Sequence, residues 1–568
     1  VGAPASAAAV FAAFNNGTSL MSYVGHGGIH LWADENLLNI GQVEGLSPQA
    51  QQPLVLTMNC LNGYFHFPYF NSMAEELLKL YAERNAAERP AVEPAGTAYS
   101  EFEATFPFEE TRDQEKAIDD VMADLDEAQP MDRLVCGDVG FGKTEVALRA
   151  AFRVAMSGRQ VAILCPTTVL AQQHFRTFSA RLDGYPLRVD VLSRFVPKPK
   201  QTETLAALKA GRVDVVIGTH RLLSSDVLFR DLGLVIIDEE HDHSFKQQEG
   251  LRYSARDLAV WRAQRLGVPV LLGSATPSLE SLYNVRQGRY RHLQLPERAG
   301  QALAPRLRLL DLRGQPMRDL LSEPLLAAMG RHLKNHGQVL LFLNRRGFSP
   351  VLLCHACGWV AGCKRCDARM TLHQRYAELR CHHCGSQRPV DRFCPACGSS
   401  ELVGIGEGTE RIEQALLEHF PAHPVLRIDR DTTRRKGELE AALSEARSGQ
   451  ARILLGTQML AKGHHFPGVT LVAVLDADQG LFSVDFRASE RLAQLIIQVA
   501  GRAGRADKPG EVLIQTHHPE HPLLQLLVER GYPAFAEAAL EERQEALLPP
   551  CASMALLRAE ATRADYPR

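Results

Sequence analysis

The sequence predicts an α/β protein with two parallel-sheet lobes, a small cysteine-rich insertion within the second lobe and an incomplete α/β fragment at the N-terminus. Three observations support this prediction. A glycine-rich loop stands between a strand and a helix near residue 140, a second series of apolar strands begins near residue 338, and eight of the 12 cysteines lie between Cys354 and Cys397. The 568 residues are 45% hydrophobic and 23% charged, as in ordinary globular proteins.

The charge, the hydropathy and the cysteine content indicate which partners the protein can bind and in which compartment it works. The net charge is −3, so any nucleic-acid binding must come from local basic patches. No apolar run approaches the roughly 18 residues of a membrane span, and we expect no membrane association. Paired cysteine clusters beside a nucleotide-binding loop indicate bound metal in a reducing compartment, and we expect the cytoplasm.

The first lobe, expected over residues 111–296, carries the nucleotide-binding loop. Residues 137–144 read G-D-V-G-F-G-K-T, after an apolar run and before a helical pattern. This is the P-loop pattern, in which Gly137, Gly140 and Gly142 let backbone N–H groups point at phosphates. Lys143 is expected to reach the β and γ oxygens, and the Thr144 hydroxyl to hold Mg²⁺.

An acidic turn follows the apolar strand at residues 234–237. A carboxylate at this strand end is where Mg²⁺ needs a second protein contact, so Asp238 is the predicted metal carboxylate. Glu239 is predicted to orient and deprotonate the attacking water. The later stretch G-S-A-T-P-S at residues 273–278 resembles a helicase motif that couples the nucleotide state to the grip on DNA.

The second lobe is expected over residues 297–352 and 399–545. It closes with Q-V-A-G-R-A-G-R at residues 498–505, which we expect on a helix. Arg502 and Arg505 lie three positions apart and would then share one helix face. Two guanidinium groups there could reach the γ-phosphate across the cleft between the lobes, as arginine fingers.

The insertion, expected over residues 353–398, contains four C-x-x-C knuckles. They predict two tetrahedral sites with four cysteines each, hence two Zn²⁺ ions. Because only five residues separate the first two knuckles, spacing favours a nested pairing of the inner two and the outer two. The predicted ligands are Cys354, Cys357, Cys363, Cys366, Cys381, Cys384, Cys394 and Cys397.

Two family resemblances cover these lobes. Residues 80–234, with P-T-T-V-L-A-Q-Q-H at 166–174 and G-T-H-R-L-L at 218–223, resemble the transcription-repair coupling factors, which are DNA translocases. Residues 238–568 resemble the primosomal replication-restart helicases, including their aromatic-rich loop at 243–257. Both resemblances imply two RecA-like lobes of a superfamily 2 helicase.

The resemblances also imply function. Gln114 matches a glutamine that reads adenine, which makes ATP the expected nucleotide. The restart-helicase resemblance implies 3′→5′ unwinding of forked or single-stranded DNA. It also implies nested zinc sites and, as partners, other restart proteins and the loader of the replicative helicase. A transcription-repair translocase is the alternative, although RNA polymerase is not an expected partner because the corresponding binding region is not recognised before Leu80.

The N-terminal residues 1–78 resemble gingipain-type cysteine peptidases, with His26 as the implied base and Cys60 as the implied nucleophile. Residues 79–110 are expected to be a helix and a linker, and residues 546–568 the start of a truncated C-terminal domain. A cysteine peptidase fragment is therefore a further alternative. Because the resemblances meet near residues 76–80 and 234–240, the chain could also be a non-functional chimera whose first lobe packs poorly at the second junction.

Overall fold

The computed structural model describes most of the two lobes and little of the N-terminal region. The described residues are 20–25, 54–59, 92, 96–138, 140–247, 253–296, 305–343, 351–366, 369–373, 378–381, 385–404, 409–429, 432–433, 438–457, 460, 466–483, 485–504 and 510–552. Residues 86–540 form one compact unit, and residues 1–85 with 541–568 form another. No described helix is long and apolar enough to cross a membrane.

The smaller unit contains one described pair of strands. β1 (Leu20–Gly25) and β2 (Leu54–Asn59) pair in parallel, as expected of an α/β fragment. His26 and Cys60 follow these strands directly in sequence and lie outside the described residues, so their predicted roles stay predictions.

The first lobe is a seven-stranded parallel sheet in the order β5-β6-β4-β7-β8-β3-β9. Its strands are β3 (Asp132–Gly137), β4 (Gln160–Leu164), β5 (Val189–Leu192), β6 (Val215–Gly218), β7 (Leu232–Asp238), β8 (Val270–Ser274) and β9 (Arg291–Leu295). Its helices are α4 (Thr97–Ala104), α5 (Arg112–Asp126), α6 (Lys143–Met156), α7 (Thr168–Arg181), α8 (Lys198–Lys209), α9 (Ala255–Arg265) and α10 (Leu279–Arg286), with short 3₁₀ turns at His220–Leu223 and His243–Phe245.

Apolar cores lie on both faces of this sheet, which explains why its central strands are apolar without alternation. The junction expected near residues 234–240 falls on β7, which pairs with β4 on one side and β8 on the other. Leu234 and Ile237 on this strand are fully buried. The sheet therefore runs across the junction without a break.

Helix α4 lies within the segment expected to be a helix and linker. Its Phe102 is fully buried and stacks on Phe152 of α6, with ring centroids 4.1 Å apart. Fully burying a side chain of this size contributes about 1.5–3 kcal/mol. Residues 97–104 therefore belong to the core of the first lobe.

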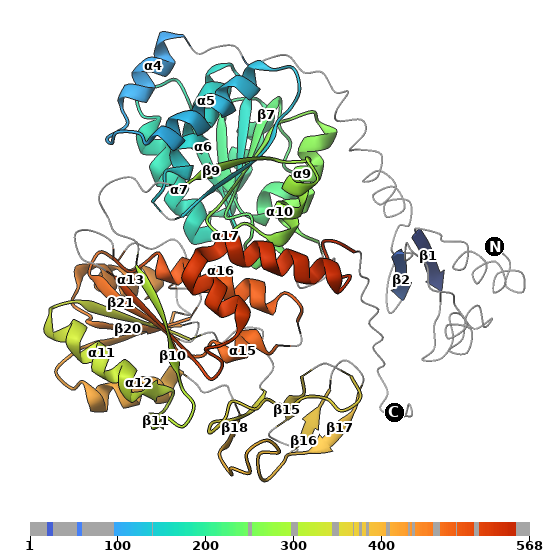
Figure 1. The fold of residues 1–568 in the computed structure, drawn as a ribbon. Coiled ribbons are helices and arrows are strands. Elements are labelled where there is room, and N and C mark those ends of the chain that lie inside the picture. The colour runs from blue at the N-terminus through green and yellow to red at the C-terminus, as the bar shows by residue number, and fades with distance from the viewer. Residues whose placement is uncertain are drawn as a thin grey trace, which may run out of the picture. The chain divides into compact units, whose positions relative to one another are not determined.

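The second lobe is a six-stranded parallel sheet in the order β10-β22-β21-β13-β20-β19 (Figure 1). Its strands are β10 (Arg306–Asp311), β13 (Gln338–Phe342), β19 (Val425–Ile428), β20 (Ile453–Gly456), β21 (Val469–Val474) and β22 (Glu511–Thr516), with a hairpin of β11 (Met317–Arg318) and β12 (Leu321–Ser322). Its helices are α11 (Glu323–Lys334), α12 (Thr409–His419), α13 (Glu438–Ser448), α15 (Asp478–Leu481), α16 (Ala488–Ala500) and α17 (Pro522–Glu545). The two sheets confirm the predicted pair of α/β lobes.

The cysteine-rich insertion is made of short antiparallel strands. β14 (Leu352–Cys354) pairs with β18 (Leu402–Gly404), and β15 (Thr371–His373), β16 (Glu378–Arg380) and β17 (Gln387–Pro389) form a small sheet. Its apolar core is small and includes the side chain of Cys381. So few buried residues cannot stabilise a domain alone, which is the usual reason for a structural metal.

Candidate nucleotide and zinc sites

The predicted P-loop connects β3 to the N-terminus of α6. Gly140 and Gly142 adopt φ of 90° and 87°, in the left-handed region that favours glycine. Gly137 lies close to β9, since a Cβ there would come within 2.9 Å of Leu295 Cβ. Lys143 Nζ donates to the carbonyl oxygens of Gly137 and Asp138, the latter at 3.1 Å. The loop therefore has the turn geometry and the cation of a phosphate site.

Gln114 is packed against this loop. Its Nε2 donates to the carbonyl oxygen of Phe141 at 3.0 Å, and a Cβ on Gly142 would lie 2.4 Å from the same nitrogen. Its Oε1 accepts from the backbone N–H of Thr111, which closes the N-terminal capping box of α5. Gln114 thus fixes the start of α5 to the loop, and its predicted contact with adenine stays a prediction.

The acidic pair lies at the end of β7, where Asp238 is the last residue of the strand and Glu239 follows it, at the same carboxyl edge of the sheet as the P-loop. His174 on α7 lies with its Nε2 2.8 Å from Asp238 Oδ2. Burial alone would raise the pKa of Asp238, but the His174 imidazole and the Lys143 ammonium outweigh it and hold the pKa below its usual value. Burial raises the pKa of Glu239, which favours proton uptake nearer neutral pH. The two neighbouring carboxyls are therefore suited to different tasks.

Sequence reasoning did not identify His174 as a part of this site. The sequence shows only that α7 follows β4, whereas the structure shows that β4 is the neighbour of β7 in the sheet. Residues after the carboxyl ends of adjacent parallel strands meet at one edge. The Asp238 carboxylate raises the pKa of His174 even though burial opposes this, so the imidazolium form is favoured.

Residues of the second lobe contact the acidic turn. Gln498 Nε2 on α16 lies 2.5 Å from His241 Nε2, and His241 Nδ1 lies 2.7 Å from Ser274 Oγ. Gln494 Nε2 donates to the carbonyl oxygen of Thr276 at 3.3 Å. The acidic turn, the stretch at residues 273–278 and α16 thus form one hydrogen-bonded group.

The predicted helical placement of Arg502 is wrong. Helix α16 ends at Ala500, and Arg502 lies in the following turn, where its backbone N–H donates to the carbonyl oxygen of Val499. Gly501 and Gly504 explain the early end, because glycine disfavours helix and Gly504 adopts φ of 69°. The Arg502 side chain is buried, and Arg505 lies outside the described residues.

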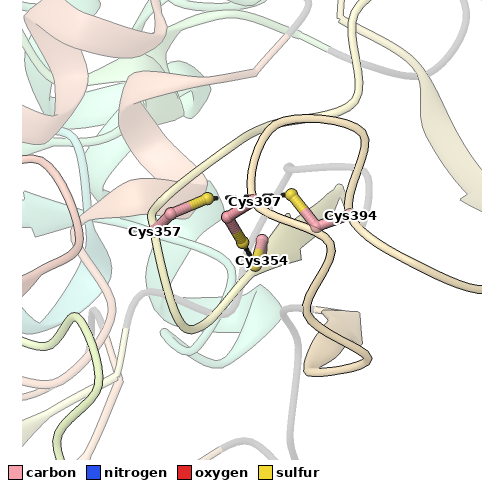
Figure 2. Close-up of side chains that lie close together, drawn as sticks. All are labelled: Cys354, Cys357, Cys394 and Cys397. Carbon is pink, nitrogen blue, oxygen red and sulfur yellow. Dashed lines mark hydrogen bonds between the residues drawn. The ribbon is translucent and has the colours of Figure 1, made fainter.

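The insertion brings the outer two knuckles together. Figure 2 shows the sulfur atoms of Cys354, Cys357, Cys394 and Cys397 pointing toward one another, all within 4.8 Å. Two of the sulfur pairs are 3.7 Å apart, close to the edge of about 3.8 Å that follows from a tetrahedron with Zn–S distances of about 2.3 Å. A disulfide would need about 2.05 Å. The geometry fits one zinc ion.

The inner knuckles meet in the same way. The sulfur atoms of Cys363, Cys366 and Cys381 lie within 4.8 Å of one another, and Cys384 lies outside the described residues. Three knuckles end in a glycine with positive φ whose N–H bonds back to the first cysteine's carbonyl: Gly358, Gly385 and Gly398. These contacts agree with the nested pairing that the sequence favoured.

The Cys394 sulfur has the electrostatics of a metal ligand. Burial would raise its pKa, but the backbone N–H groups of Cys397 and Ala396 outweigh it and lower the pKa of Cys394 to about 7. A thiol with this pKa is about half ionised at neutral pH, far more than an ordinary thiol, and the thiolate is the form that binds metal.

Family models match most of the described chain. Residues 111–285 match "DEAD/DEAH box helicase" and residues 403–507 match "Helicase conserved C-terminal domain". Residues 363–389 match "PriA DNA helicase Cys-rich region (CRR) domain", and residues 2–86 match "Peptidase family C25". The replication restart protein PriA of Haemophilus influenzae is 51% identical over 432 residues, which are 76% of this chain and 58% of that protein.

The chain is similar to the replication restart proteins. The Bacillus subtilis restart protein PriA is 38% identical over 459 residues, 80% of this chain and 56% of that protein. The chain thus spans a little over half the length of these relatives. A match of 432 residues in a chain of 568 must include residues 137–432, so the likeness to restart proteins extends upstream of residue 238, where we expected it to begin.

Solved structures agree on the fold. RecG bound to a three-way DNA junction gives a TM-score of 0.51 at 19% identity, over 84% of this chain and 57% of that chain. At this identity the likeness concerns the fold alone. The two RecA-like lobes with a cysteine-rich insertion are therefore confirmed, and the helicase family models over residues 111–285 and 403–507 agree with this fold. The resemblance of residues 80–234 to transcription-repair coupling factors stays a prediction.

Proposed function

We propose that this chain is an ATP-dependent DNA helicase of replication restart, in which ATP hydrolysis drives 3′→5′ movement on DNA. One observation supports it most directly. The acidic turn that follows β7 is hydrogen-bonded to the second lobe through His241 and Gln498, 2.5 Å apart. A contact of this kind lets events at the nucleotide in one lobe change the position of the other, which is what a two-lobe motor requires.

The residues at this edge have complementary roles. Lys143 binds the β and γ oxygens, while Thr144 and Asp238 would hold Mg²⁺, which neutralises phosphate charge when bound. Glu239 takes the proton of the attacking water, for which its raised pKa suits it. Arg502 and Arg505 stabilise the charge that develops on the γ-phosphate, and Gln114 with the glycines at 137, 140 and 142 completes the ATP site.

The test is the rate of ATP hydrolysis with and without single-stranded DNA. In Lys143→Ala we expect the DNA-stimulated rate to fall at least about a hundredfold, because one preorganised cation at the phosphates is lost. Lys200→Ala is the matched control, since this exposed lysine on α8 pairs with Glu203 away from the loop. Equal rates for Lys143→Ala and the parent would show that the P-loop assignment is wrong.

We also propose two structural Zn²⁺ ions. Cys354, Cys357, Cys394 and Cys397 would hold one, and Cys363, Cys366 and Cys381 with Cys384 the other. The sulfur separations of 3.5 to 3.7 Å support tetrahedral sites, and thiolate ligands require a reducing compartment such as the cytoplasm. Elemental analysis of the purified chain should find about two zinc ions per molecule.

The proposed partners are forked or single-stranded DNA, other restart proteins and the loader of the replicative helicase. Restart proteins are the relatives that span most of this chain, which favours them over a transcription-repair translocase bound to RNA polymerase. A peptidase activity has no support among the described residues, because both His26 and Cys60 lie outside them.

A further inference from the structure

A cavity of about 730 Å³ lies between the cysteine-rich insertion and the second lobe. The insertion contributes Trp359, Lys364 and Arg369 to its lining, and the second lobe contributes Phe482, His518 and His521. None of these six residues belongs to the predicted ATP site or to the predicted cysteine ligands. The cavity is large enough for a nucleotide-sized group.

Specific contacts hold the two walls of this cavity together. His355, in the knuckle between Cys354 and Cys357, has its Nδ1 2.9 Å from His517 Nε2 and its Nε2 2.8 Å from the carbonyl oxygen of Gln315. His517 Nδ1 lies in turn 2.7 Å from Asp478 Oδ2. These bonds form a continuous chain from the zinc knuckle to a buried carboxylate of the second lobe. The cavity between the walls is therefore a fixed part of the fold.

Aromatic rings line the lobe side of the cavity. The Phe482 ring centroid lies 4.5 Å from that of His518 and 6.3 Å from that of His521, both with steep interplanar angles. The Arg369 guanidinium lies over the Phe482 ring, 5.5 Å from its centroid. A ring that stacks one planar cation can stack another planar group, and a nucleobase has this shape.

The polar groups of the cavity suit a base better than a metal. His521 Nδ1 is a buried nitrogen with no hydrogen-bond partner among the described residues, and His518 Nε2 is a buried nitrogen whose polar neighbour is the backbone of Gly358. Burial lowers the pKa of both imidazoles, so they are neutral near pH 7 and can donate or accept. Where the structure is described, only the two cysteine groups bring three or more potential ligand atoms within 4.8 Å, so these histidines form no metal site.

The charges at the cavity favour a polyanion. Lys364 and Arg369 are exposed at its rim. The carboxylate of Asp391 is paired with Arg388, and that of Glu520 with Arg313 at 3.1 Å. With both acids paired, the unshared charge at the rim is positive, although the whole chain is slightly negative. Phosphates on either side of an inserted base would meet these cations.

We propose that this cavity binds one unstacked base of single-stranded DNA, with the base on Phe482, its edge at His518 and His521, and the flanking phosphates at Lys364 and Arg369. The proposal rests on the proposed DNA-dependent function and assigns a strand contact to the junction between the insertion and the second lobe. A strand held there by a base as well as by its phosphates would be gripped independently of sequence.

The experiment compares two fluorescent strands of about 16 nucleotides, one of thymidines and one with abasic positions at its centre. Anisotropy measures the affinity of each for the full chain. Phe482→Leu keeps an apolar side chain against Val351, Leu353 and Val360 but removes the ring. We expect it to weaken binding of the thymidine strand about tenfold, since stacking of one base is the interaction lost, and to leave binding of the abasic strand unchanged.

Matched controls come from the same insertion. Phe393 is 62% exposed and Arg392 is exposed, and neither lines the cavity. Phe393→Leu and Arg392→Ala should leave both affinities unchanged, whereas Arg369→Ala should weaken both strands alike. Zinc content is measured for every variant, so that a lost insertion is not mistaken for a lost contact.

The outcomes separate this proposal from the function on which it rests. If Phe482→Leu binds both strands as the parent does, the base site is refuted, and a protein segment becomes the better occupant of the cavity. If the parent shows no DNA-stimulated hydrolysis, the proposed function fails instead. The proposal holds only if the loss is selective for the thymidine strand in a chain that retains its zinc and its stimulated hydrolysis.

Discussion

Glu240 joins three elements of the first lobe, and its removal should destabilise that lobe strongly. Its side chain is fully buried at the end of β7. It accepts hydrogen bonds from the backbone N–H of Ser278 at 2.7 Å, from Ser281 Oγ at 2.8 Å, from Arg256 at 2.9 Å and from Ser278 Oγ at 3.0 Å. These donors lie at the starts of α9 and α10, so one carboxylate fixes both helices to the strand.

The expected loss of unfolding free energy in each Glu240 variant depends on which hydrogen-bonding groups the substitution leaves without a partner. Glu240→Ala leaves a buried guanidinium, a backbone N–H and two hydroxyls without this acceptor, and breaking a buried ion pair costs about 3–5 kcal/mol. Arg256 keeps its contact with Asp257 at 2.7 Å, so we expect no more than this range. Glu240→Gln keeps one acceptor oxygen but turns an amide group toward a donor, and should cost about 1.5–3 kcal/mol.

Urea unfolding followed by Trp261 fluorescence measures this effect. Trp261 lies on α9, and replacing Trp32 and Trp359 by Phe makes it the only tryptophan of the chain. With a slope of about 2 kcal/mol per molar urea for a domain of this size, the Glu240→Ala midpoint should fall by about 1.5–2.5 M.

The control is Glu203→Ala, which removes an exposed carboxylate on α8 that pairs with Lys200 and Arg188. Its midpoint should equal that of the parent, since exposed ion pairs contribute little. If Glu240→Ala shifts the midpoint no further than Glu203→Ala, the buried carboxylate does not hold α9 and α10 to the strand, and the reasoning above is wrong.

Three further predictions concern the sites and the core. Cys357→Ser should lower the zinc content by about one ion per chain, whereas Cys551→Ser should not change it; an unchanged content in Cys357→Ser would exclude the outer site. Gly142→Ala should weaken binding of a fluorescent ATP analogue and cost at least about 1–2 kcal/mol, while Gly158→Ala, with a similar positive φ but open space around it, should carry the backbone cost alone and bind ATP normally. Burial and the Asp478 carboxylate raise the pKa of Asp476 from 3.8 to about 7, so between about pH 4 and 7 the folded chain holds a proton that the unfolded chain has lost, and stability falls as the pH rises. Relative to the parent, Asp476→Asn should gain about 4 kcal/mol in unfolding free energy over this pH window. A difference between variant and parent that does not change with pH would contradict the shift.

Local patterns predicted the fold well because each depends on a short stretch of chain. The P-loop needs only a strand, a glycine-rich turn and a helix in succession, and the structure places residues 132–156 in this order. The knuckles likewise depend on a two-residue spacing and a following glycine. The fold class is confirmed and the chain is similar to the replication restart proteins, whereas the roles of the individual site residues stay predictions.

Contacts between residues far apart in the chain could not be predicted from local sequence patterns. His174 and Asp238 are 64 positions apart, and His241 and Gln498 are 257 apart. Strand order decides the first contact, since β4 and β7 are neighbours only in the folded sheet. The misplaced Arg502 has a different cause. Spacing of three suggests a helix face only while the helix continues, and two glycines end it first.

Asp238, Glu240 and His241 at the end of β7 reach three different surroundings, and one backbone angle makes this possible. Asp238 faces His174, and Glu240 points to the starts of α9 and α10. His241 meets Ser274 and, on the second lobe, α16. Glu239 between them adopts φ of 49°, a left-handed conformation that costs a non-glycine residue about 1–2 kcal/mol. The buried contacts of Glu240 offset this cost, because they exist only if the chain turns there. The same turn brings Glu239 of the predicted hydrolysis site within two positions of His241, which makes the contact between the lobes. A residue substituted for Glu240 should therefore impair hydrolysis as well as stability, while the proposed base site beside the insertion should be unaffected.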